Sequence, residues 1–154
     1  MSFFTYLWKE DQYDYFRENP KLKLEQSDSN LFLKRDVRVG DFLYIIAIVK
    51  GRHHILGRME ISEIGPCERK ISRLRKDSTT SEYSDHAVAR TATKFYFNKI
   101  IPIKVILQMR FVPKSGISKP PVFTKEGKPD PQTFRGVRQL MPASAQMLDG
   151  ILNL

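Results

Sequence analysis

The pattern of apolar and polar positions predicts a structure built mainly on β-strands. Residues 42–49 form an unbroken run of aliphatic, β-branched and aromatic side chains, and residues 54–61 follow after a tight turn at 50–52. Two such runs joined by a glycine-containing turn are typical of a β-hairpin. Because the first run is apolar on both faces, we expect it at the centre of the sheet. Gly57, inside the second run, indicates a bulge or a close backbone approach.

Three further strands are predicted outside this hairpin. Residues 3–7 are aromatic and β-prone, and residues 94–97 and 103–111 are two more apolar runs. Pro102 lies between the last two runs. Because proline cannot donate a hydrogen bond to a neighbouring strand, it favours a break or an edge position there.

Short helices and polar loops complete the pattern. Residues 11–17 predict a short helix that ends before Pro20. Residues 142–152 carry apolar pairs at the spacing of an amphipathic helix, with a proline in the first turn. Residues 21–30 are polar and loop-like, and the chain turns polar again at 69–90, where residues 77–81 are predicted to form an exposed loop. The elements together predict an α+β fold.

Positive charge is concentrated toward the end of the chain. The chain has 26 lysines and arginines against 17 acidic residues, for a net charge of +9. Residues 1–90 carry 16 basic and 14 acidic side chains, whereas residues 91–154 carry 10 and 3. A lopsided positive potential attracts polyanions such as nucleic acid or an anionic membrane surface, although a basic composition also serves solubility alone.

Residues 112–139 hold much of this charge. The segment has five prolines, little periodicity, and only Glu126 and Asp130 as acidic residues. Its basic residues are Lys114, Lys119, Lys125, Lys128, Arg135 and Arg138. A segment of this length without regular structure is usually functional or mobile. We therefore predict a basic, proline-rich loop at about 112–139.

Length and composition indicate one globular domain spanning residues 1–154. The single cysteine, Cys67, excludes an intramolecular disulfide and fits a thiol-reducing compartment. The N-terminus does not resemble a signal peptide, and no apolar stretch approaches the roughly 20 residues of a membrane-spanning helix. We therefore expect a cytoplasmic protein with no membrane partner.

No catalytic or metal-binding constellation stands out. His53, His54 and His86 have no cysteine or carboxylate at zinc-ligand spacing. Cys67 has neither a glycine-rich elbow nor a plausible partner histidine nearby. The glycines do not form a phosphate-binding loop. This pattern favours a binding protein over an enzyme, with no cofactor and no metal.

Aromatic side chains are interleaved with the basic ones. A ring offers a stacking face to any base, worth about 1–3 kcal/mol per base, although most aromatic residues on strands pack in the core. Trp8 is the only tryptophan, and it follows a predicted strand among polar residues. We therefore predict that Trp8 lines the mouth of a pocket rather than the interior.

Several segments, in order along the chain, resemble the PUA-like superfamily, particularly its EVE and YTH-type members. They are the first strand ending at Trp8, VGDFLY at 39–44, ILGRMEI at 55–61, LQMRF at 107–111, and RGVRQLMP at 135–142 before the terminal helix. The resemblance implies a small, strongly curved β-barrel of about five or six strands, flanked by short helices that include a C-terminal one. Such domains often read a modified or flipped-out base in an aromatic pocket while basic residues hold the backbone.

The resemblance also implies a site. By position, Trp8 and Tyr44 would line the base pocket, and one of Phe4, Phe42 and Tyr96 would complete it. A YTH-type cage has more than one tryptophan, so the single tryptophan here departs from that pattern. The residues expected to contact phosphates are Arg58, Arg110, Arg135 and Arg138, together with Lys125 and Lys128 of the proline-rich loop.

These observations predict a nucleic-acid-binding module for DNA or RNA that reads a modified or flipped base. By family analogy it would serve a prokaryotic defence or modification-sensing system, alone or beside a protein partner that carries a catalytic activity. Two alternatives stay open. One is an ASCH-like nuclease or hydrolase that uses a lysine or an acid in the same cleft. The other is a protein-interaction adaptor whose basic loop meets an acidic partner.

Overall fold

The structure, a computed structural model, describes residues 1–66, 84–113, 120–121, 123–127 and 130–154. Over these residues it has an α+β fold with one six-stranded mixed sheet. The strands are β1 (Phe3–Trp8), β2 (Gln26–Ser29), β3 (Phe42–Val49), β4 (Arg52–Pro66), β5 (Asp85–Ala92) and β6 (Val137–Leu140). The helices are α1 (Glu10–Glu18), α2 (Ile103–Gln108) and α3 (Pro142–Leu152), with the short 3-10 helices η1 (Leu33–Arg35) and η3 (Pro131–Phe134).

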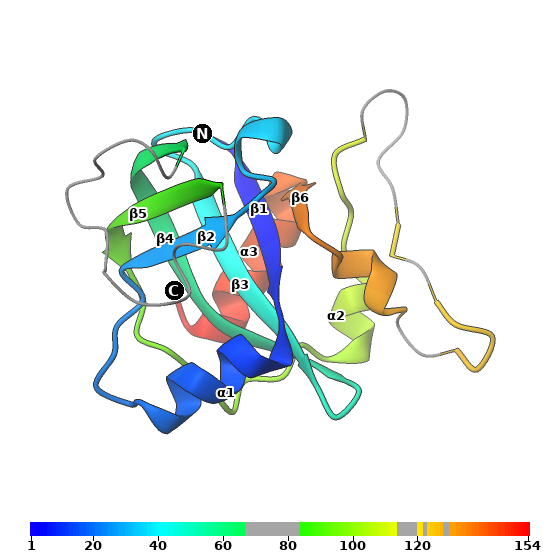
Figure 1. Cartoon of the computed structure of the whole chain (residues 1–154). Coiled ribbons are helices and arrows are strands. Elements are labelled where there is room, and N and C mark those ends of the chain that lie inside the picture. Colours follow the sequence, from blue (N-terminus) through cyan, green and yellow to red (C-terminus); the bar gives the residue numbers. More distant parts are fainter. Residues whose placement is uncertain (67–83, 114–119, 122, 128–129) are drawn as a thin grey trace.

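The predicted hairpin forms the middle of the sheet (Figure 1). β3 pairs antiparallel with β4 and parallel with β1, so the prediction that its apolar run is central is confirmed. The strand order is β2-β5-β4-β3-β1-β6. In the described part of the chain the two edge strands, β2 and β6, do not pair with each other. The sheet is therefore open, and the closed barrel expected from the resemblance does not form among these strands.

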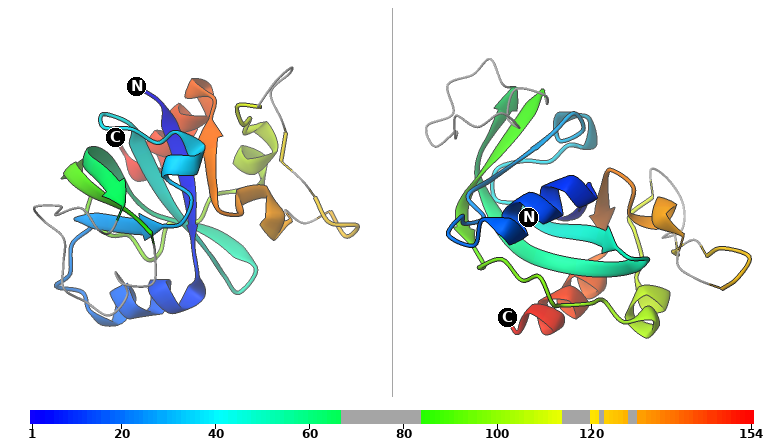
Figure 2. Two further views of the ribbon diagram at one scale, coloured as in Figure 1. Left: turned by 45° about the horizontal axis from the view of Figure 1, so that its top comes forward. Right: turned by 60° about the horizontal axis from the view of Figure 1, so that its bottom comes forward.

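Alternation along β1 sends its side chains into two separate cores, because successive residues of a strand point to opposite faces. Phe4, Tyr6 and Trp8 pack in the core that α1 covers. Phe3 and Leu7 pack against the core that α2 and α3 cover. Figure 2 shows α1 and α3 on opposite sides of the sheet. β1 is thus enclosed on both faces, and its outer edge is covered by β6.

Both predicted terminal helices are confirmed as α1 and α3, but two predicted strands are wrong. Residues 94–97 form no strand, and residues 103–111 begin with the helix α2. Ile106 is buried, whereas Ile103 and Leu107 are 55% and 50% exposed. Burial on one side only is typical of a helix that packs one face against a core. The β-branched composition of the run had favoured a strand. No helix of the described residues is long and apolar enough to cross a membrane.

Three stretches predicted as polar or loop-like contain regular structure. β2 lies within 21–30, β5 begins at Asp85 within the polar stretch 69–90, and η3 and most of β6 lie within 112–139. The exposed loop predicted at residues 77–81 lies outside the described residues. All four residues of β2 are polar, yet all are buried. They are buried because they find partners: Ser27 Oγ accepts a hydrogen bond from Trp8 Nε1 at 3.1 Å. The polarity of these residues was therefore not a reliable sign that they lie on the surface.

Both features predicted for Gly57 are confirmed. The β3–β4 register shifts between Ile45 and Ile46, beside the position where Gly57 pairs with Ile45. A Cβ at Gly57 would lie 2.7 Å from Thr93 Oγ1. A side chain of any size would displace the segment that follows β5.

Candidate functional site

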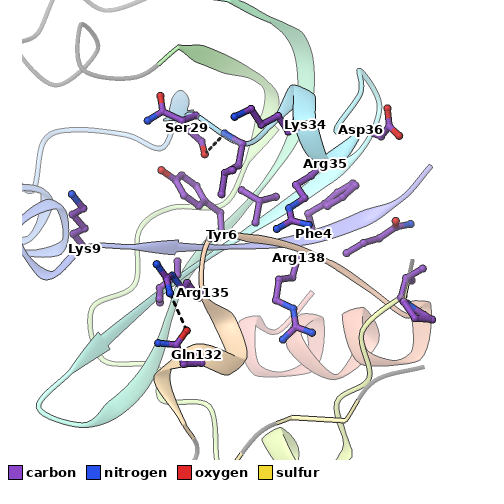
Figure 3. Close-up of a pocket in the computed structure, with 18 of the residues that line it drawn as sticks. Phe4, Tyr6, Lys9, Ser29, Lys34, Arg35, Asp36, Gln132, Arg135 and Arg138 are labelled. Atoms are coloured by element: carbon purple, nitrogen blue, oxygen red, sulfur yellow. Dashed lines mark hydrogen bonds between the residues drawn. The ribbon is translucent and has the colours of Figure 1, made fainter. Parts of the chain in front are cut away.

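A groove lies along β1 and the edge strand β6 (Figure 3), with a volume of about 910 Å³. Phe4, Tyr6 and Leu7 of β1 contribute to its floor. One wall comes from residues 29–36, which include η1, and is called the η1 wall below. The other comes from residues 132–139, from the end of η3 into β6, and is called the β6 wall. Together these parts are called the basic groove.

Buried polar contacts hold the η1 wall in place. Asp85 of β5 accepts a hydrogen bond through Oδ2 from the backbone N–H of Leu33, the first residue of η1, at 3.1 Å. The Tyr6 hydroxyl donates to the backbone carbonyl of Asp28 at 2.5 Å. The Asp28 carboxylate also pairs with Nδ1 of His86, a histidine expected in a polar loop but fully buried here. Together these contacts join β1, β2, β5 and η1 beneath the η1 wall.

Strand pairing holds the β6 wall. Arg138 lies opposite Thr5 in the antiparallel β1–β6 ladder, and Leu7 donates its backbone N–H to the Gly136 carbonyl at 3.1 Å. Gly136 has a φ of +69°, which glycine adopts without steric cost. A Cβ there would lie 2.8 Å from Cδ1 of Leu31, on the opposite wall. The two walls therefore come into close contact beside Leu7.

Five cationic side chains surround the basic groove. They are Lys9 after β1, Lys34 and Arg35 in η1, Arg135 after η3, and Arg138 in β6. Among the described residues that line the groove, Asp36 is the only acidic one; its side chain is 84% exposed and lies 3.7 Å from Arg38. Within the described ranges none of the five cations forms an ion pair. The groove therefore carries a positive potential that the described residues do not neutralise.

Arg138 is the most constrained of these cations. Its guanidinium lies 3.8 Å from the centroid of the Phe111 ring, and Nη1 donates to the Thr133 carbonyl. Burial, followed by the nearby charge of Arg35, lowers the pKa of Arg138. The lowered pKa means that the charged form of Arg138 is disfavoured by its surroundings. An anion between the two walls would therefore be attracted by both Arg35 and Arg138.

Only Phe4, of the five aromatic residues predicted for a base pocket, lines the basic groove. Trp8 is 3% exposed, and its indole stacks on Phe16 at a centroid distance of 5.0 Å. The prediction that Trp8 lies at a pocket mouth is therefore corrected. Alternation along β1 gives Trp8 the same face as Phe4 and Tyr6, and at that end of the strand this face is covered by α1.

The other three aromatic residues face the opposite core. Tyr44 is fully buried, and its hydroxyl donates to Asp149 Oδ1 at 2.7 Å. Burial, and then the Asp149 carboxylate, raise the pKa of Tyr44. Phe42 and Tyr96 are partly buried against the same core. The five aromatic residues are thus divided between two faces of the sheet and do not form one pocket.

Two of the arginines predicted to contact phosphates have partners within the protein. Arg58 Nη1 lies 3.0 Å from Asp149 Oδ1, and its guanidinium covers the Phe42 ring at 4.7 Å. Arg110 Nη1 donates to the carbonyls of Leu107 and Met109 at 2.9 and 2.7 Å. Neither arginine lines the basic groove. The contact of Arg58 joins β4 to α3, whereas the contacts of Arg110 are local, at the end of α2.

Two of the four basic residues predicted to contact phosphates from the proline-rich segment lie in the basic groove. Arg135 and Arg138 line the basic groove. Lys125 is exposed and does not line it, and Lys128 lies outside the described residues.

Sequence reasoning missed Lys9, Lys34 and Arg35. The first 90 residues are nearly balanced in charge, with 16 basic and 14 acidic side chains, so the bulk count directed attention to the C-terminal part. The adjacent Lys34-Arg35 pair was the available local signal. What makes these residues a site is their position opposite Arg135 and Arg138, which depends on β1–β6 pairing across the whole chain.

No three metal-ligating side chains come together in the segments that the structure describes. Neither the known family models nor the curated proteins include a match to this chain.

Proposed function

We propose that this protein is a nucleic-acid-binding module of the PUA-like kind that holds a phosphate backbone in the basic groove. The observation that carries the proposal is the convergence of five cations from three parts of the chain on one groove, with none of the five in an ion pair within the described residues. A nucleic acid presents phosphates in series, so one ligand can engage several of these cations at once. The motif resemblance points to the same class of ligand.

The chemistry of the walls supports phosphate as the anion. Three of the five cations are arginines, whose planar guanidinium matches phosphate oxygens with two parallel hydrogen bonds. Arg138 is already held by the Phe111 ring and the Thr133 carbonyl. A side chain fixed before binding loses less entropy when the ligand arrives.

Fluorescence anisotropy with labelled DNA and RNA oligonucleotides tests this proposal. The double variant Arg35→Glu/Arg135→Glu reverses one exposed charge on each wall. Each reversal is expected to lower affinity on the order of tenfold, because like charges then face the phosphates. Lys21→Glu is the matched control, since Lys21 is exposed and lies outside the groove lining, and one such reversal there should leave affinity nearly unchanged.

Salt dependence gives a second readout. If all five cations contact phosphates of a single strand, the plot of log K against log salt has a slope of about −3.5, and the double variant loses about 1.4 of that slope. Oligonucleotides with and without modified bases, compared at one salt concentration, test base reading. Binding that is equal in the wild type and the double variant would refute the assignment of the groove.

A further inference from the structure

The basic groove has two ends, each with its own cations. Figure 3 shows Arg135 toward the end where Lys9 lies, and Arg35 and Arg138 toward the other. The strand register gives the same division, since Arg138 lies opposite Thr5 whereas Lys9 directly follows β1. Thr5 and Lys9 are separated by about 13 Å of strand, at about 3.3 Å per residue.

A waist lies between the two ends. Gly136 is hydrogen-bonded to Leu7, about halfway between Thr5 and Lys9, and it approaches Leu31 so closely that a Cβ would lie 2.8 Å away. The walls therefore leave little width at this point. A ligand that contacts both ends has to be narrow enough to pass over the waist.

Regular duplex does not suit this shape. Proteins read duplex by inserting a helix or a β-ribbon into its major groove, which is about 12 Å wide. Here the cations line a depression rather than a protrusion, and the walls nearly meet within it.

We infer that the basic groove takes an unpaired strand of nucleic acid along β1, with one phosphate at the Lys9–Arg135 end and another at the Arg35–Arg138 end. This inference rests on the proposed function. At the axial spacing of one strand of B-DNA, about 3.4 Å per nucleotide, a span of about 13 Å corresponds to about four nucleotide steps, so a strand that keeps this spacing reaches both ends with about five nucleotides. The two ends then act as linked subsites, so a strand that reaches both binds more tightly than one that reaches a single end.

A length series of labelled oligothymidylates, from dinucleotide through pentanucleotide to decanucleotide, tests this arrangement alongside a mixed-sequence duplex. We expect the pentanucleotide to bind at least about tenfold more tightly than the dinucleotide. Affinity per site should then level off, and duplex should bind at least about tenfold more weakly than the decanucleotide.

The two ends are separated with single reversals, Arg135→Glu at one and Arg35→Glu at the other. Each should reduce pentanucleotide affinity to near that of the dinucleotide. The control is Arg52→Glu at the exposed tip of the β3–β4 hairpin, because an antiparallel β-ribbon is an element that can enter a duplex major groove.

The outcomes separate this inference from the proposal on which it rests. Affinity that climbs evenly with length, or duplex bound as tightly as single strand, overturns the inference while leaving groove binding intact. Duplex binding that Arg52→Glu abolishes and the groove reversals spare overturns both. Absence of binding to every oligonucleotide overturns the proposed function itself.

Discussion

Asp149 joins α3 to the sheet, and replacing it with alanine is expected to destabilise the fold while sparing the basic groove. Its Oδ1 accepts hydrogen bonds from the Tyr44 hydroxyl at 2.7 Å and from Arg58 Nη1 at 3.0 Å. A hydrogen bond to a charged group contributes about 1.5–3 kcal/mol. The Arg58 and Asp149 side chains are 25% and 23% exposed, which reduces their ion pair to about 1 kcal/mol or less.

Asp149→Ala also leaves the buried Tyr44 hydroxyl without its acceptor. The expected loss is therefore about 3 kcal/mol in the free energy of unfolding. For a domain of this size that corresponds to a melting temperature lower by about 6–12 °C. Urea denaturation followed by circular dichroism measures the loss.

Tyr44→Phe removes only the hydroxyl, so we expect about half that loss, and the double variant should lose less than the two single losses together. Nucleic-acid affinity of the folded variants should be unchanged, because neither residue lines the basic groove. A loss below about 0.5 kcal/mol for Asp149→Ala would refute the structural role. Weaker binding by folded Tyr44→Phe would return Tyr44 to the binding site.

Three further predictions concern glycines, a histidine and the tryptophan. Gly57→Ala should lower the free energy of unfolding by about 1–3 kcal/mol, because the new Cβ meets Thr93. Gly150→Ala, in open space on α3, should raise it by up to about 1 kcal/mol. Urea denaturation midpoints compare the two variants. Burial lowers the pKa of His53 below its ordinary 6.5, so its contribution to stability is present above pH 6.5 and lost as pH falls through the lowered pKa. Urea midpoints between neutral and mildly acidic pH should therefore fall less for His53→Gln than for the wild type. Trp8 is 3% exposed, so its emission should be blue-shifted, with oligonucleotide binding leaving it unquenched; strong quenching would contradict its place in the core.

The parts of the fold that were predictable are those set by neighbouring residues. The β3–β4 hairpin and the helices α1 and α3 follow from local periodicity and from turn or proline signals, and the structure has all three. α2 was misread because a short run of β-branched residues has the same composition in a strand and in a buried helix face. Its state depends on the core that Ile106 enters, which no local pattern specifies.

The candidate site was less predictable, because it depends on contacts between distant segments. β2 reads as a polar loop, and its burial depends on partners such as Trp8 and His86 from other strands. Arg135 and Arg138 were found because they stand in a basic segment. Lys9, Lys34 and Arg35 could be recognised as site residues only from the structure, because β1–β6 pairing and the position of η1 across the groove from β6 bring them together with Arg135 and Arg138.

The pairing of β1 with β6 has a consequence for how the molecule is made. Phe3 lies opposite Leu140 in that ladder, so β1 gains its outer neighbour only after residues 137–140 have been synthesised. Until then the nascent chain carries β1 with an uncovered edge, the kind of strand edge on which other chains can pair. Contacts so far apart in sequence also slow folding. The basic groove, with β1 beneath it and β6 beside it, is therefore completed only after β6 has been synthesised, and a chain cut short before residue 137 would lack it.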